Sequence, residues 1–265
     1  MTVIIRTGAS DTDVINVLFQ NVFEEGTFTY TNQDVGYPAA NTITDSTWDA
    51  WIPSSATSSI IVDCGSAVFC DTLGIAAHNM ATEAASFRLQ HSTDGTSWTT
   101  ISAQYSPLTN EDIIVRFAAT ADRWWRVSIM DTVATVGVVK LGFSLKFPCG
   151  PLSGHKPLHH SRKVELLTNE SMGGNLLGNR PVKMGAKTSI NVGQVIRDWA
   201  ENDLASFESH YNRGGAFFYC GAPDVIPKDM GYCWRDGGMD EMSVTWVEGD
   251  AMADVSFDVR SYVPA

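Results

Sequence analysis

Short strands between closely spaced turns are the feature that most constrains the fold of this chain. Between residues 59 and 129, segments rich in β-branched and aromatic residues alternate with turn residues about every ten positions. In the segment 86–91, Phe87 and Leu89 alternate with Arg88 and Gln90, which is typical of a half-buried strand. No long helical pattern interrupts the series, so the sequence predicts a β-sandwich. The expected strands are 59–63, 73–78, 86–91, 98–101, 113–117 and 123–129.

Length and hydrophobicity indicate how many cores the chain can form. Its 265 residues suit two domains of roughly 100–150 residues each. No apolar run approaches the roughly 20 residues that a membrane-spanning helix needs, which predicts a soluble protein without membrane insertion. Residues 1–7 lack a basic start and a sustained apolar stretch, so we expect no secretory signal and synthesis in a cytoplasm.

Charge and cysteine content argue against two classes of function. The net charge is −12, and both halves are acidic, with −8 up to Pro148 and −4 beyond it. Binding to nucleic acid requires a basic face, so we expect no nucleic-acid partner. The five cysteines are odd in number and form no CxxC pair, which indicates free thiols rather than a zinc or redox site.

Three segments of the first half carry a family resemblance. They are a strand ending in Asp-x-Gly at 59–65, a turn of the form Ser-x-Asp-Gly-x-x-Trp within 89–98, and an Arg-aromatic-x-Arg strand at 123–127. In this order they resemble the discoidin, or coagulation-factor C-domain, family, and the resemblance covers about residues 30–146. It implies a galactose-binding-like β-sandwich. The disulfide that often joins the domain ends in secreted members has no matching cysteine pair here.

The resemblance also implies a ligand surface. Residues 36–51 lie where the family carries its ligand-facing loops, and sugar-binding members stack exposed aromatic side chains on pyranose rings there. The candidates carried over are Tyr37, Asn41, Trp48, Trp51 and His78. The alternative is that these aromatic side chains close the end of the sandwich or face a neighbouring subunit. Some relatives bind calcium near Asp45, Ser46 and Thr47, but a lone carboxylate falls short of six oxygen ligands, so we predict no metal.

A segment dense in proline and glycine, 147–154, separates the two halves, and we place the domain boundary there, giving domains 1–148 and 149–265. Beyond it, strands are expected at 163–169 and 187–192, and one helix at about 193–213, ending at Gly214 and Gly215. The helix has apolar residues at spacings of three to five, among them Trp199, Phe207 and Tyr211. The prediction for the whole chain is therefore mainly β, with an amino-terminal sandwich and a carboxy-terminal α+β sandwich.

The second half carries a looser resemblance. A helix with Asp198-Trp199 and Phe207 is followed by 215–219, a loop containing proline, 232–234 and a closing strand at 254–259. This order resembles the distal-tail or minor tail proteins of long-tailed bacteriophages, which form rings at the tail tip. The resemblance implies a ring-forming homo-oligomer with other phage tail proteins as partners.

Three groups of residues are candidates for chemistry. His155, His159 and His160 are separated by a proline in the linker, so we expect no metal site. The glycine-rich stretch 173–180 lacks the Lys and Ser or Thr of a phosphate-binding loop and is interpreted as an ordinary loop; the alternative is a flexible tongue that orders on assembly. Acidic residues gather at 236–250; two of them could face each other as the carboxylate pair of a glycosidase, but turn chemistry and solubility explain them more simply. We expect no enzyme, no catalytic residue and no cofactor.

Together these features predict a structural virion protein of a bacteriophage tail tip or baseplate. It would be made in the host cytoplasm, assemble as a ring through residues 149–265, and carry a sandwich that decorates the ring or binds a host cell-surface glycan. The competing hypothesis is a carbohydrate-binding module, or lectin, without a ring-forming role.

Overall fold

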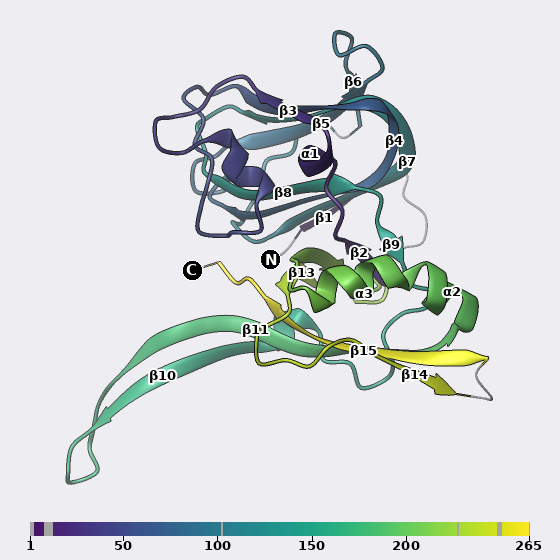
Figure 1. The fold of residues 1–265 in the computed structure, drawn as a ribbon. Helices are drawn as coiled ribbons and strands as arrows, with labels where there is room; N and C mark the ends of the chain where they lie inside the picture. The colour runs from purple at the N-terminus through teal and green to yellow at the C-terminus, as the bar shows by residue number, and fades with distance from the viewer. Residues whose placement is uncertain (1–2, 8–12, 102, 227, 248–250, 265) are drawn as a thin grey trace.

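The computed structural model describes residues 3–7, 13–101, 103–226, 228–247 and 251–264. It is mainly β, with a sandwich formed by the first half of the chain and a second sheet that carries helices (Figure 1). This confirms the predicted fold class. Within the described residues, no helix is long and apolar enough to cross a membrane.

Two long, bent strands build the sandwich. Strands β4 (Ser58–His78) and β7 (Ile113–Met130) pair along most of their length and curve together from one layer into the other (Figure 1). Their outer ends, 58–63 and 124–130, form one layer with β3 (Thr27–Tyr30), β5 (Ser86–Ser92) and β6 (Thr99–Thr100). Their other ends form the second layer with β8 (Val136–Gly142) and with β1 (Val3–Thr7), which runs parallel to β7.

The predicted break at Cys64 and Gly65 is wrong, because β4 continues through it. Gly65 has a positive φ of 73°, a conformation that glycine adopts at little cost, and the pairing with β7 shifts register between Asp63 and Val68. Segments 113–117 and 123–129 are likewise one strand. The pairing of β4 with β7 is interrupted at this bend and resumes at Val68, so the turn signal marks a bend within the strand and not its end.

The sandwich core lies between its layers and follows part of the predicted alternation. Phe87 and Leu89 of β5 are fully buried, as are Trp125 and Val127 of β7, while Arg88 is only half-buried. Burying a side chain of this size contributes roughly 1.5–3 kcal/mol relative to leaving it in water. The alternation holds from Phe87 to Leu89 and fails at Gln90, which was expected on the solvent side and is buried.

The second domain is built on an eight-stranded sheet in the order β10-β11-β15-β13-β12-β2-β9, with β14 paired to β15. Two of these strands come from the first half of the chain, β2 (Asn16–Leu18) and β9 (Leu145–Lys146). Its other strands are β10 (Arg162–Glu170), β11 (Leu176–Ile196), β12 (Phe217–Cys220), β13 (Met230–Trp234), β14 (Ser243–Val247) and β15 (Met252–Ser261). On β15, Val255, Phe257 and Val259 are buried, as their alternation with polar residues predicts.

The helical segment is shorter than predicted and is divided. Helices α2 (Arg197–Asn202) and α3 (Leu204–Asn212) are separated by Asp203, and residues 193–196 belong to β11. Val195 and Ile196 pair with Ala253 and Met252, so hydrogen bonding to β15 outweighs the helical spacing of these apolar residues. The predicted apolar face is present, because Phe207 and Tyr211 pack against Phe257.

Two segments of the first half enter the second sheet. Strand β2 (Asn16–Leu18) pairs with both β12 and β9 (Leu145–Lys146). The short helix α1 (Val22–Glu25) then leads the chain back into the sandwich, and residues 8–12 lie outside the described part of the chain. The boundary at residue 148 stays a prediction, and the strand pairing shows that both sides of it contribute to the second sheet.

The contact between the domains is apolar at its centre. A separate cluster of buried side chains joins β4, β7 and β8 to β12 and β13, and it includes Leu18, Ile114, Val138 and Phe218. Gly74 lies directly under the Phe218 ring, where a Cβ atom would be only 2.4 Å from the nearest ring carbon. The two domains are therefore packed against each other through buried side chains that both domains contribute.

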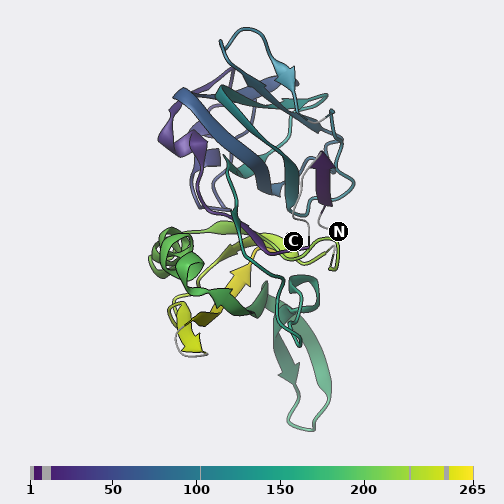
Figure 2. The ribbon, with the colours of Figure 1, turned by 90° about the vertical axis from the view of Figure 1, so that its right-hand side faces the viewer.

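Strands β10 and β11 form a long, twisted hairpin that leaves the body of the protein (Figures 1 and 2). From Arg162 to Glu170, β10 pairs only with β11, and β11 joins β15 from Ala186 onward. We call residues 162–186 the arm. The tip of the arm lies in the glycine-rich stretch 173–180, for which the sequence analysis gives a flexible tongue as an alternative.

Candidate functional site

The predicted ligand-facing segment, residues 36–51, is held in place by Asn32, which lies just before it. Its backbone carbonyl accepts a hydrogen bond from Trp51 Nε1 at 3.1 Å, and its side-chain Oδ1 accepts bonds from Ser54 N at 2.9 Å and Ser58 Oγ at 2.8 Å. The start of the loop is thereby tied to its end and to the first residue of β4. These bonds replace the regular ladder that the loop lacks.

Trp51 is a core residue and not a binding residue. Its side chain is fully buried in the sandwich core, and its backbone pairs with Val136 of β8. An indole that is buried on all sides cannot stack on a sugar, so Trp51 is removed from the candidate surface. Trp51 instead fits the alternative prediction, in which the aromatic side chain closes the end of the sandwich.

His78 is also structural. Its ring is buried at the end of β4, Nε2 lies 2.9 Å from the carbonyl of Glu111, and Nδ1 accepts a hydrogen bond from Met80 N. Burial lowers the pKa of His78 to about 4, so the ring is neutral at pH 7 and donates from Nε2. His78 therefore fixes a loop and does not face a ligand.

Asn41 and Tyr37 lie in the loop itself. Asn41 Nδ2 donates to the carbonyl of Ala50 at 2.9 Å and so closes the segment 41–50 into a compact turn. Tyr37 is half-exposed, and its backbone bridges to Asp34. Asn41 thus shapes the loop, while the Tyr37 ring is available at its surface.

Trp48 is the predicted residue that stands out of the surface. Its side chain is 92% exposed. Ser46 Oγ accepts hydrogen bonds from the backbone N–H groups of Trp48 and Asp49 at 3.3 and 3.2 Å, which orders the turn that carries the indole. A large aromatic side chain on an ordered turn is a rigid platform, because few rotatable bonds remain to be fixed on binding.

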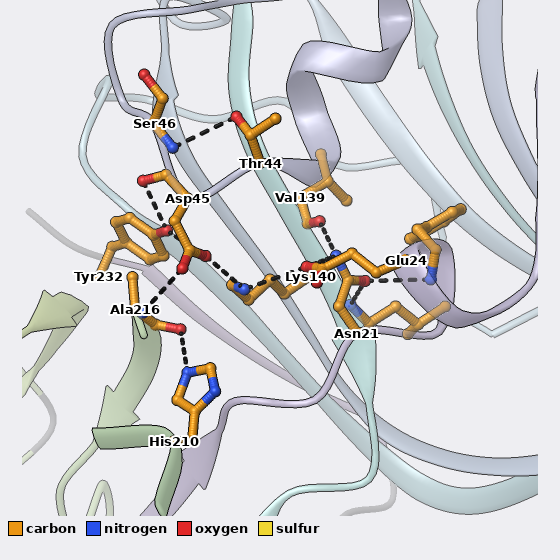
Figure 3. A network of polar contacts seen from close by, with 12 residues as sticks. Asn21, Glu24, Thr44, Asp45, Ser46, Val139, Lys140, His210, Ala216 and Tyr232 are labelled. Carbon is orange, nitrogen blue, oxygen red and sulfur yellow. Dashed lines mark hydrogen bonds and ion pairs between the residues drawn. The ribbon is translucent and has the colours of Figure 1, made fainter. Parts of the chain in front are cut away.

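Three residues before Trp48, Asp45 anchors the loop to the second domain (Figure 3). Its carboxylate is paired with Lys140 Nζ at 2.7 Å and accepts a hydrogen bond from Ala216 N at 3.0 Å, and its backbone carbonyl accepts one from the Tyr232 hydroxyl at 3.1 Å. His210 in turn contacts the carbonyl of Ala216. The loop that presents Trp48 is therefore held by both domains.

Electrostatics explain why Asp45 is charged at this position. The Lys140 side chain is only 2% exposed, whereas that of Asp45 is 45% exposed, and Glu24 lies 3.4 Å from the same ammonium group. Partial burial raises the pKa of Asp45, but Lys140 and the hydrogen bond from Ala216 outweigh it and hold that pKa below its usual value. A carboxylate neutralised by lysine is a poor calcium ligand, and the absence of a metal at this position stays a prediction.

The sequence analysis missed Lys140 and Tyr232. A signal for Lys140 exists, because it is the only charged residue in the apolar strand Val136–Gly142, and a buried charge requires a partner. No pattern in the sequence indicates that the partner is Asp45, which is 95 positions away. Tyr232 gives no signal, since its hydroxyl becomes a donor only where the two domains meet.

The candidates for chemistry have structural roles where they are described. His155 is buried and paired with Asp229 at 2.7 Å, and Tyr219 donates a hydrogen bond to the same carboxylate, so this histidine is part of the second domain and not of an exposed linker. Asp236 pairs with Arg260. Glu248 and Asp250 lie outside the described residues. The described side chains include no group of three or more His, Cys, Asp or Glu that could hold a metal ion.

Comparison with known proteins gives structural likenesses only. No family model matches the chain, and no curated protein matches it. The solved structures that resemble it include a Ruminococcus gnavus GH29 fucosidase, with 16% identity, a TM-score of 0.41, and coverage of 47% of this chain and 27% of the fucosidase. This chain thus spans about a quarter of that enzyme.

Two of the similar structures are carbohydrate-binding modules. One is a Clostridium perfringens CBM32 module in complex with GalNAc-β-1,3-galactose, with 15% identity, a TM-score of 0.40, and coverage of 48% of this chain and 99% of the module. The other is a chitosan-binding module from Paenibacillus sp. IK-5, with 19% identity, a TM-score of 0.39, and coverage of 46% and 98%. The resemblance of the second half to phage tail proteins stays a prediction.

Proposed function

We propose that this protein binds carbohydrate through the loop surface around Trp48. The observation that carries the proposal is the 92% exposure of the Trp48 indole on a turn that hydrogen bonds and an ion pair hold in place. An indole combines a large apolar face with a polar N–H group, a combination that is enriched at binding surfaces. An aromatic face with nearby hydroxyl and carboxylate groups suits the apolar face and polar rim of a pyranose ring.

The neighbours of Trp48 fit this role. Hydroxyl and carboxylate groups within five positions of Trp48 come from Thr44, Ser46 and Asp49. Tyr37 adds a second aromatic ring, which is half-exposed, to the same loop segment. Because the backbone is fixed before binding, little conformational entropy is lost when a ligand arrives. We therefore expect a shallow, preformed site for a sugar unit rather than an enclosed pocket.

The test is a binding titration with oligosaccharides. Chitosan oligomers, pectin fragments and GalNAc-β-1,3-galactose form the first panel, followed by a broad glycan array. We expect Trp48→Ala to weaken binding at least tenfold. The matched control is Val35→Ala, since Val35 lies in the same loop and is 95% exposed but has no aromatic face. If no glycan binds, or if both variants bind as the parent does, the proposal fails.

A second candidate function is a structural subunit of a virion, in which the second domain assembles into a ring at a phage tail tip. The observation that favours it is the arm, an exposed hairpin in which β10, within the described residues, pairs only with β11. In this function the other tail proteins are partners, and the sandwich decorates the ring. Light scattering over a concentration series, with negative-stain images, tests it, and closed rings are the expected result. Neither candidate involves catalysis.

A further inference from the structure

The arm exposes an unusual amount of apolar surface. Among its exposed side chains are Val164, Leu166, Leu167, Leu176, Leu177 and Met184. A monomeric protein scatters such residues singly, whereas here they share one narrow ribbon. Two paired strands with no third strand and no helix against them are only marginally stable in water. The arm is thus a surface that requires a covering partner.

The apolar residues are sorted by face where the arm leaves the body. Val164 lies opposite Met184 across the two strands, and Leu166 is two positions further along on the same face. Lys163 and Glu165 alternate with them and so occupy the other face. One face of this stretch is therefore apolar and the other charged, the arrangement of a strand pair that lies on another protein surface.

We propose that the arm of one molecule binds a groove on the sandwich of a second copy of this chain. The groove lies beside the bend of β4 and β7, has a volume of about 470 Å³, and is lined mostly by apolar residues, including Val68, Ala119 and Phe143. Phe69 is 61% exposed and Phe143 44% exposed at its rim. An apolar ribbon with aliphatic side chains is a suitable occupant for such a groove.

Charge favours a second copy as the occupant. The arm contains four basic and two acidic residues, a net charge of +2, in a chain of −12, so the rest of the chain carries −14. Glu25 lines the groove, and Glu24 lies next to it on helix α1. The basic arm and the acidic body of two copies therefore attract each other.

The geometry requires two molecules. In Figure 1 the arm extends to the lower left, while the bend of β4 and β7 lies on the right of the sandwich, so the arm points away from the groove of its own molecule. Each copy offers an arm on one side and a groove on the other. Such a head-to-tail contact closes into a ring if the rotation between copies allows, and otherwise forms a filament.

This inference rests on the assembly function proposed above and is independent of carbohydrate binding. The test uses the full chain with two exposed double substitutions. Leu166→Ser with Leu177→Ser removes apolar surface from the arm, and Phe69→Ser with Phe143→Ser removes it from the groove. Val225→Ser is the control, because Val225 is 70% exposed but belongs to neither surface. Circular dichroism checks that every variant is folded.

We expect the parent and the control to form oligomers in light scattering and each double variant to be monomeric. An equimolar mixture of the two double variants should form dimers and nothing larger, since it contains one intact arm facing one intact groove. Oligomers that persist in the arm variant, or a mixture that stays monomeric, overturn the inference but leave assembly intact. A parent that is monomeric at all concentrations overturns both, and arm-dependent binding of such a monomer to anionic vesicles would assign the arm to a membrane surface.

Discussion

Replacing Asp45 with Asn tests whether the loop anchor stabilises the protein. The substitution keeps the shape of the side chain and removes the charge that faces Lys140, whose side chain is 2% exposed. Removing one partner of a fully buried ion pair costs about 3–5 kcal/mol. Asp45 is 45% exposed and Glu24 remains 3.4 Å from the ammonium group, so we expect about half of this, roughly 2 kcal/mol.

The measurement is urea unfolding followed by tryptophan fluorescence. With a slope of about 3 kcal/mol per molar urea, a loss of 2 kcal/mol lowers the midpoint by about 0.7 M. The pH dependence has a definite sign, because the folded pKa of Asp45 is below its unfolded value. The stabilisation is complete above about pH 4 and is lost as the pH falls through the folded pKa. The Asp45→Asn variant should lack this acid-dependent component.

A double-mutant cycle separates the ion pair from other effects. Lys140→Met removes the buried charge. In that background, Asp45→Asn should lower the free energy of unfolding by less than 1 kcal/mol, compared with about 2 kcal/mol in the parent protein. Glu24→Gln, which acts on the more distant carboxylate, should cost less than Asp45→Asn. Equal losses in both backgrounds would falsify the claim that Asp45 acts through Lys140.

Three further outcomes follow from buried positions. Burial raises the pKa of Asp112 to about 7, so the free energy of unfolding should fall by about 4 kcal/mol as the pH rises from about 4 to about 7, and Asp112→Asn should flatten this profile in chemical unfolding at several pH values. Gly74→Ala should lower the free energy of unfolding by at least 2 kcal/mol, because its Cβ would collide with Phe218. The control is Gly237→Ala, which has open space around it and should change the free energy of unfolding by less than 1 kcal/mol. Trp51→Ala should lower the free energy of unfolding by about 3–5 kcal/mol, and a loss below 1 kcal/mol would contradict its place in the core.

Alternation along strands was the most informative part of the sequence. It located the buried residues of β15, and Phe87 and Leu89 of β5, because each strand has one face on a core, but it missed the burial of Gln90. It failed at Gly65, where a turn signal lies inside a continuous strand, and at Val195, where helical spacing lies inside β11. At Val195 the conformation is decided by pairing with β15, far away in the sequence, and after Gly65 the strand continues because pairing with β7 resumes at Val68. No local pattern indicates either partner strand.

The candidate surface was predictable as a segment but not residue by residue. Trp48 and Trp51 are three positions apart in the same loop, yet one indole is exposed and the other is fully buried. The difference arises because Trp51 pairs with Val136 and donates to Asn32, contacts that exist only in the folded sandwich. Composition alone cannot separate a platform from a core residue at such close spacing.

Because β2 and β9 belong to the second sheet, the sandwich cannot be exchanged for another domain at a single junction. A sandwich joined by one linker can be exchanged between genes at a single junction. Here the chain enters the second sheet at Asn16–Leu18 and again at Leu145–Lys146, so a cut at residue 148 would remove β2, which pairs with β12, and β9, which pairs with β2, together with the sandwich. A different binding domain could be grafted in only between these two crossings, as an insertion that keeps both strands in place.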